Sequence, residues 1–188
     1  MSKKVCILFT ATNGLHYVND KVSKKNMYGI ARLISLTYSI GHYDDNNNYV
    51  QEKYVNSILK PKSIHFNKEA QKFHNISYEQ AEKEGLDSKE IIEEFKKDLK
   101  DVKVIVSHSL DFHLKSIQSE CFRTCISIEF NKFILIDTMS FQHNYSFPKL
   151  LDLESKLKLK KASNNINKIA NIFGNLYLTY KNELKSHS

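Results

Sequence analysis

The chain opens with the apolar run Val5-Cys6-Ile7-Leu8-Phe9, and the turn-forming pair Asn13-Gly14 follows it. A short apolar run of this kind, bounded by a turn, is typical of a strand that is buried on both faces. Asn-Gly is among the strongest local signals for a reversal of the chain. We therefore expect residues 5–9 to form the first strand and to lie at the centre of a sheet.

Two more strand-like segments follow this opening. Segments 31–40 and 49–59 are rich in β-branched and aromatic residues, which favour extended structure. Residues 44–48 read DDNNN, a composition typical of a hairpin tip. The Lys-rich stretch from His16 to Tyr28 is expected to be a loop. The first third of the chain therefore predicts three strands in a meander.

Three helical segments come next, and each has a capping signal. Asn67 is placed to cap the first, and Ser77 with Gln80 forms a capping-box pattern for the second. Asp87 opens the third. Its apolar residues recur at helical spacing at Ile91, Ile92, Phe95 and Leu99.

The remaining segments alternate between strand and helix. The apolar run 102–106 and the segment 133–136 predict two strands, with a helix over 111–123 between them. The last third is helical, with an apolar stripe at Ile166, Ile169, Ala170, Phe173, Leu176, Tyr177 and Tyr180. This order predicts an α/β fold in which helices flank a mixed sheet of about five strands. No linker interrupts it, so a single domain over residues 1–188 is expected.

The charge balance points to an anionic partner. The 188 residues carry a net charge of +7, and the isoelectric point is near 9.1. Nucleic acid is the commonest partner of such proteins, and a soluble basic protein without such a partner is the alternative.

The cysteines and the N-terminus bear on the compartment. An odd count of three cysteines without CxxC spacing favours neither a disulfide framework nor a zinc site. Cys121 and Cys125 lie four apart on an expected helix, so buried thiols are predicted. The apolar run behind Met1-Ser2-Lys3-Lys4 is far shorter than the roughly 18 residues of a membrane span. We expect an intracellular protein, cytoplasmic or nuclear, that is neither secreted nor membrane-bound.

Several segments match, in order, the motifs of one enzyme family. Residues 7–15 (ILFTATNGL) are similar to FDTETTGL, and residues 31–38 (ARLISLTY) are similar to PRLVQLAW. Residues 106–115 (VSHSLDFHLK) are similar to VAHNIDFDLK, and the C-terminal matches are at 148–153 and 162–173. Residues 68–85 add a further match. Together they resemble the DnaQ-like (DEDDh, RNase H-type) 3′–5′ exonuclease family.

The resemblance implies a specific catalytic chemistry. Such enzymes hydrolyse phosphodiesters with two metal ions held by carboxylates, while a histidine acts as general base. Phe9, His113 and Asn165 stand here at the positions of the family's three Asp residues. Ala11 stands at the position of the Glu, and Lys160 at that of the His. Phenylalanine and alanine cannot bind a metal, and lysine would repel one. The resemblance therefore implies a pseudo-exonuclease without a cofactor and without catalytic residues.

One displaced metal site stays open as an alternative. Asp111, His113 and Asp137 could together form a makeshift site, and the chain would then be an active exonuclease. The competing interpretation gives Asp111 the role of a helix N-cap and gives Asp137 a hydrogen bond in a turn or loop.

Two non-catalytic functions follow from the resemblance. In the first, the chain binds single-stranded nucleic acid without cleaving it. The lysines around the former general-base position would meet phosphates, and Tyr17, or else Tyr28 or Phe9, would stack on a base. These lysines are Lys149, Lys156, Lys158, Lys160, Lys161 and Lys168. They could equally be the solvated faces of helices. In the second function, the chain is a protein-interaction scaffold that uses the loop from His16 to Tyr28.

Overall fold

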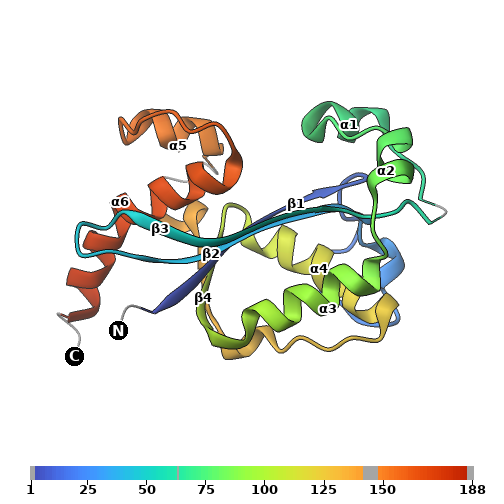
Figure 1. Cartoon of the computed structure of the whole chain (residues 1–188), viewed down its shortest axis with the longest axis horizontal. Coiled ribbons are helices and arrows are strands. Elements are labelled where there is room, and N and C mark those ends of the chain that lie inside the picture. Colours follow the sequence, from blue (N-terminus) through green and yellow to red (C-terminus); the bar gives the residue numbers. More distant parts are fainter. Residues whose placement is uncertain (1–2, 63, 142–147, 186–188) are drawn as a thin grey trace.

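The computed structural model describes the backbone of residues 3–62, 64–141 and 148–185, and their side chains except residues 141 and 177–185. Five strands form one sheet in the order β3-β2-β1-β4-β5 (Figure 1). The strands are β1 (Lys4–Thr12), β2 (Leu33–Tyr43), β3 (Tyr49–Ile58), β4 (Val102–Ser107) and β5 (Ile134–Asp137). β2 pairs antiparallel with β1 and β3, whereas β1, β4 and β5 run parallel. The mixed sheet with a central first strand is confirmed.

Helices cover both faces of this sheet (Figure 1). The described α-helices are α1 (Lys68–His74), α2 (Tyr78–Glu84), α3 (Ser88–Asp98), α4 (Leu110–Thr124), α5 (Leu150–Lys156) and α6 (Asn165–Lys185). Helices α3 and α4 pack on one face, and α6 packs on the other. Within the described ranges, no helix combines the length and apolarity that crossing a bilayer requires.

The alternation of side chains along β1 builds two cores. Cys6 and Leu8 point toward α3 and α4, where they join a buried cluster that includes Phe95. Val5 and Ile7 point to the opposite face and pack against α6. Phe9 and Ala11 continue this second set of positions along β1. They therefore lie on the α6 side of the sheet, where Phe9 packs against the cluster that contains α6 and Ala11 belongs to a separate small cluster.

The N-cap signals agree with the structure, but the capping box at Ser77 and Gln80 is only half formed, because the side chain of Gln80 bonds to Glu84. The side chains of Asn67, Ser77 and Asp87 each accept a backbone N–H in the first turn of α1, α2 and α3, respectively. Gln80 donates its side-chain amide to Glu84 along α2.

The thiols agree only in part with the prediction. Cys121 is buried as predicted, but Cys125 is exposed. Cys125 lies beyond the last residue of α4, at a left-handed φ of 58°, so the helical spacing no longer applies to it. The predicted stripe of α6 is buried at Ile166, Ile169, Ala170 and Phe173. The side chains of Tyr177 and Tyr180 lie outside the described residues.

Candidate functional site

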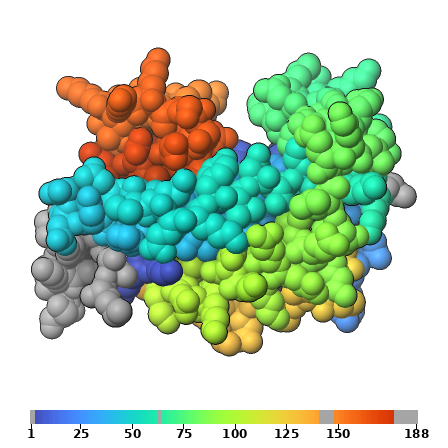
Figure 2. Space-filling model, in the orientation of Figure 1, coloured from blue at the N-terminus to red at the C-terminus, as the bar shows by residue number. Residues whose placement is uncertain are grey.

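A cleft of about 440 Å³ lies at the C-terminal end of β1. Its floor is formed by Phe9 to Thr12 of β1, one wall by α1 and the other by the start of α4. In Figure 2 a hollow separates the α5–α6 region from the α1–α2 region, above the sheet. The residues that line the cleft are Phe9, Thr10, Ala11, Thr12, Gly14, Leu15, Asn67, Glu69, Ala70, Phe73, His74, Phe112 and His113.

Apolar groups dominate the walls of this cleft. The side chain of Phe73 is 90% exposed and that of Leu15 is 75% exposed, although both are large and apolar. Helix α1 buries none of its own residues. A short helix usually depends on tertiary packing for its stability, so a helix without buried residues suggests a wall that receives a partner.

His113 ties the floor of the cleft to α4. The Thr10 backbone N–H donates to its Nδ1 at 3.2 Å, so Nδ1 is the acceptor and the ring proton lies on Nε2. Nε2 donates to the His108 carbonyl at 3.0 Å. Burial lowers the pKa of His113 to about 4. The imidazole is therefore neutral at physiological pH, and both its nitrogens are engaged within the protein.

Two other imidazoles, the half-buried His16 and the buried His108, support the same end of the sheet. The ring of His16 stacks on Phe112 at a centroid distance of 4.2 Å, and its Nδ1 accepts the Ala31 backbone N–H. His108 bridges the Thr138 hydroxyl and the Pro148 carbonyl, each at 2.9 Å. Burial lowers the pKa of both His16 and His108. These rings act as structural connectors behind residues that line the cleft, such as Phe112.

The three residues of the makeshift metal site have separate partners. The Asp137 carboxylate accepts the backbone N–H groups of Ser109 at 2.9 Å and Leu110 at 2.7 Å. Asp137, rather than Asp111, therefore caps α4, across 27 residues of sequence from Leu110. Asp111 is exposed and pairs with Lys115 at 2.8 Å. In the part of the chain that the structure describes, no three His, Cys, Asp or Glu residues form a group that could hold a metal ion.

Lys160 lines a second hollow and is not among the residues that line the cleft. That hollow, of about 570 Å³, lies between the tip of the β2–β3 hairpin and α6. The tip can approach because α6 has a glycine there: a Cβ on Gly174 would lie 2.6 Å from the Asn47 carbonyl oxygen. The segment before α6 is held by Glu154, a buried carboxylate that accepts the Ala162 backbone N–H at 2.9 Å. This anchoring, which sequence alignment does not reveal, places Lys160 beside the hairpin.

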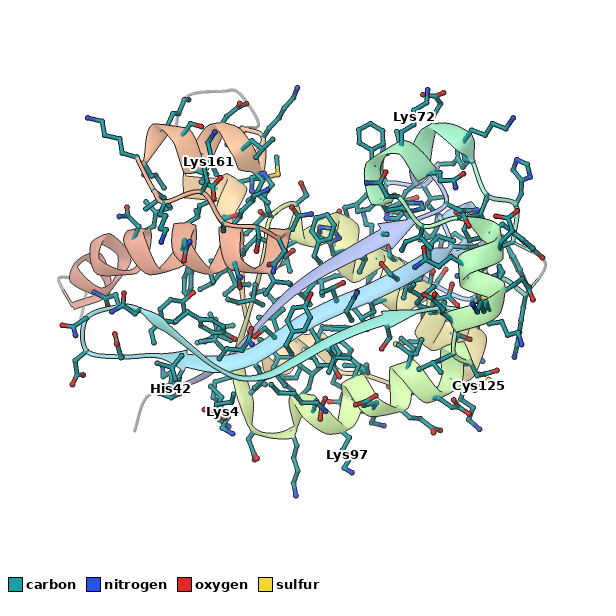
Figure 3. All side chains as sticks on the ribbon, turned by 45° about the horizontal axis from the view of Figure 1, so that its top comes forward. Lys4, His42, Lys72, Lys97, Cys125 and Lys161 are labelled. Carbon is teal, nitrogen blue, oxygen red and sulfur yellow. The ribbon has the colours of Figure 1, made fainter. Side chains whose placement is uncertain are left out.

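The other candidate residues are spread around this half of the molecule. Lys149, Lys156, Lys158 and Lys161 are exposed, whereas Lys168 and Asn165 are partly buried on α6. Figure 3 shows Lys161 in the α5–α6 region and Lys72 on α1, on opposite sides of the hollow. Tyr17 and Tyr28 are 92% and 81% exposed, and neither lines the cleft.

The walls of the cleft contain residues that sequence reasoning missed. These are Leu15, Ala70, Phe73 and Phe112. The available signal was an aromatic residue, Phe73, in a short and otherwise polar helix that offers it little apolar company.

The fold is that of exonuclease I. The product-bound structure of exonuclease I matches with a TM-score of 0.73 at 10% identity, covering 95% of this chain and 44% of that chain. E. coli exonuclease I in complex with a 5cy-dT13 oligonucleotide matches with a TM-score of 0.73 at 10% identity, covering 97% and 42%. Exonuclease I from Methylocaldum szegediense matches with a TM-score of 0.71 at 12% identity, covering 94% and 40%.

The chain thus spans less than half the length of the exonuclease I chains that it matches. No protein-family model and no curated protein matches the sequence. At these identities the likeness establishes the α/β fold alone.

Proposed function

We propose that this protein is a non-catalytic member of the exonuclease fold that binds single-stranded nucleic acid without cleaving it. The observation that carries this proposal is the composition of the cleft floor. Phe9, Ala11 and a neutral His113 lie there. A two-metal nuclease requires several carboxylates at such a place, because only anionic oxygen ligands hold two divalent cations about 4 Å apart.

Stacking and charge support the binding half of the proposal. Phe73 presents an exposed aromatic ring to the cleft, and aromatic rings bind bases of any sequence. The exposed lysines of the α5–α6 region can meet phosphates, and the net charge of +7 favours an anionic partner. Exonuclease I itself has been solved in complex with an oligonucleotide.

We expect no Mg²⁺- or Mn²⁺-dependent nuclease activity. End-labelled single strands incubated with about 5 mM MnCl₂ should stay intact. The metal should also shift Tm by less than about 1 °C, because no site binds it; a metal site at about 100 times its Kd would instead stabilise the fold by about 2.7 kcal/mol and raise Tm by several degrees. Laddering from the 3′ end, or a clear rise in Tm, would contradict the proposal. An Asp111→Ala variant that abolished such activity would then identify the makeshift site, since this exposed residue contributes little to folding.

Binding of single strands should depend steeply on salt and on the former general-base position. Each lysine that meets a phosphate of a single strand contributes about 0.7 to the slope of log affinity against log salt. A Lys160→Ala, Lys161→Ala variant should therefore lose about 1.4 from this slope. Its affinity should fall about 60-fold at about 50 mM salt and about 10-fold at about 200 mM. Fluorescence anisotropy with a labelled oligonucleotide measures both quantities.

The matched control is Lys96→Ala, Lys100→Ala, which removes the same charge from exposed positions at the end of α3. It should leave the affinity for single strands within about twofold of the parent. Equal losses in both double variants would mean that net charge alone governs binding. Unchanged slopes in the first variant would remove Lys160 and Lys161 from the interface.

A protein-interaction module is the second candidate function. Phe73 and Leu15 favour it, since exposed large apolar side chains around a cleft commonly receive a partner. A chain that binds no labelled strand even at low salt would support this candidate.

A further inference from the structure

A groove of about 370 Å³ lies at the end of the sheet opposite to the cleft. It is found where α3 ends and where β4 and β5 begin, so it lies at the N-terminal ends of these parallel strands. The cleft lies at the C-terminal end of β1, which runs parallel to both. The two sites are therefore at opposite ends of the sheet.

The floor of the groove is apolar. It contains Leu99, Val102, Ile128 and Phe133. Leu99 and Val102 belong to the core and are each 3% exposed, whereas Ile128 and Phe133 are only partly buried. The segment that carries Ile128 and Phe133 runs along the end of α3, and it leaves part of its apolar surface open to solvent.

Four lysines surround this apolar floor. Lys96 lies on α3 and Lys100 one turn further on, so they occupy one side of the groove. Lys103 on β4 and Lys132 before β5 complete the set. In Figure 3 the neighbouring Lys97 extends from α3 away from the sheet.

These lysines are poorly neutralised. Lys132 pairs with Glu129 at 2.7 Å, and Glu129 is the acidic residue among those that line the groove. Among the residues with described side chains, no carboxylate forms an ion pair with Lys96, Lys100 or Lys103. Ammonium groups gathered around an apolar surface repel one another until an anion binds.

We propose that this groove binds an acidic peptide segment of a partner protein, with an aliphatic side chain on the floor and carboxylates on the lysines. Lysine offers a compact point charge, which suits single carboxylates. A nucleic-acid backbone would meet the lysines through its phosphates but would leave the apolar floor of Ile128 and Phe133 uncovered, whereas an aliphatic side chain of a peptide would cover it. A membrane surface would be met by a protruding amphipathic helix rather than by a concave groove. Charge and shape together select the peptide.

The proposal is tested with a fluorescein-labelled hexapeptide of sequence Glu-Asp-Leu-Leu-Asp-Glu. A companion peptide carries serine in place of both leucines and has the same charge. In anisotropy titrations at about 50 mM salt, the leucine peptide should bind at least tenfold more tightly, because one buried leucine corresponds to that factor or more. Equal binding of the two peptides would overturn the apolar floor as a recognition element.

Two double variants locate the binding site. Lys96→Ala, Lys100→Ala should weaken binding of the leucine peptide about 3- to 10-fold, whereas Lys160→Ala, Lys161→Ala, with the same net charge, should not. Thermal melts verify that both variants fold. If the peptide binds both variants equally, the groove is not its site. If the peptide fails to bind and Lys96→Ala, Lys100→Ala weakens binding of a labelled single strand instead, the groove is a nucleic-acid surface and the proposal is wrong. The peptide titrations do not depend on the proposed function of the cleft.

Discussion

Replacing Glu120 with alanine should lower the free energy of unfolding by about 3–5 kcal/mol, because it leaves two partly buried guanidinium groups without their counter-charge. The side chain of Glu120 is fully buried on α4. Its Oε1 accepts from Nε of Arg32 at 2.8 Å and lies 3.3 Å from a guanidinium nitrogen of Arg123. Urea denaturation, read as a shift of the midpoint at unchanged slope, measures the loss.

This network connects three parts of the fold. Arg32 precedes β2, and Arg123 lies in the last turn of α4. Arg123 also donates to the Met27 carbonyl at 2.6 Å, between β1 and β2. Within the described residues Glu120 Oε2 has no hydrogen-bond partner, so the carboxylate depends on Oε1 for its contacts. Removing Glu120 therefore leaves two neighbouring arginines to repel each other and releases the loop.

Two controls separate charge from packing. Glu93→Ala removes an exposed i,i+4 pair on α3 and should cost less than about 0.5 kcal/mol. Glu120→Gln keeps the shape of the side chain but not its charge, and should fall between the parent and the alanine variant. A loss below about 1 kcal/mol in Glu120→Ala would show that the arginines reach solvent easily.

The elements with strong local signals were predictable from the sequence. The buried run 102–106 became β4, and the caps at Asn67 and Asp87 formed because they involve residues two apart. Strand boundaries were less accurate. β1 continues from the predicted end at Phe9 to Thr12, because its backbone pairs with β2 as far as Leu33 even though polar threonines interrupt the apolar pattern.

Contacts between distant residues were not predictable in the same way. Asp137 caps α4 from another strand, and Glu120 neutralises arginines 88 and 3 residues away. No periodicity reveals such pairs, because they depend on how the elements pack. The position of Lys160 beside the hairpin is the same kind of result. The family motifs identified the cleft floor but not the aromatic residue of its α1 wall. Phe73 lies inside the matched segment 68–85, at a position for which the match specifies no residue type.

His113 should make the stability of the fold sensitive to mild acid. Burial lowers its pKa from the ordinary 6.5 to about 4. Between these values the unfolded chain takes up a proton that the folded chain refuses, so the stability is complete above pH 6.5 and falls as the pH is lowered toward 4. This one group should remove about 3 kcal/mol between pH 7.5 and pH 4.

The contribution of His113 must be separated from those of other histidines, because they act on stability in the same direction. Burial also lowers the pKa of His16, His74 and His108. Urea denaturation of the parent and of His113→Gln at several pH values gives two curves, and the parent should lose about 3 kcal/mol more on acidification. If the variant does not fold, NMR titration of the His113 ring in the parent gives the same answer. A ring that titrates near pH 6.5 would mean that a cation can form in the cleft. A ring that stays neutral above pH 5 means that the cleft has no positive charge at this position in the cell, so an uncharged group such as a base fits beside it better than a phosphate.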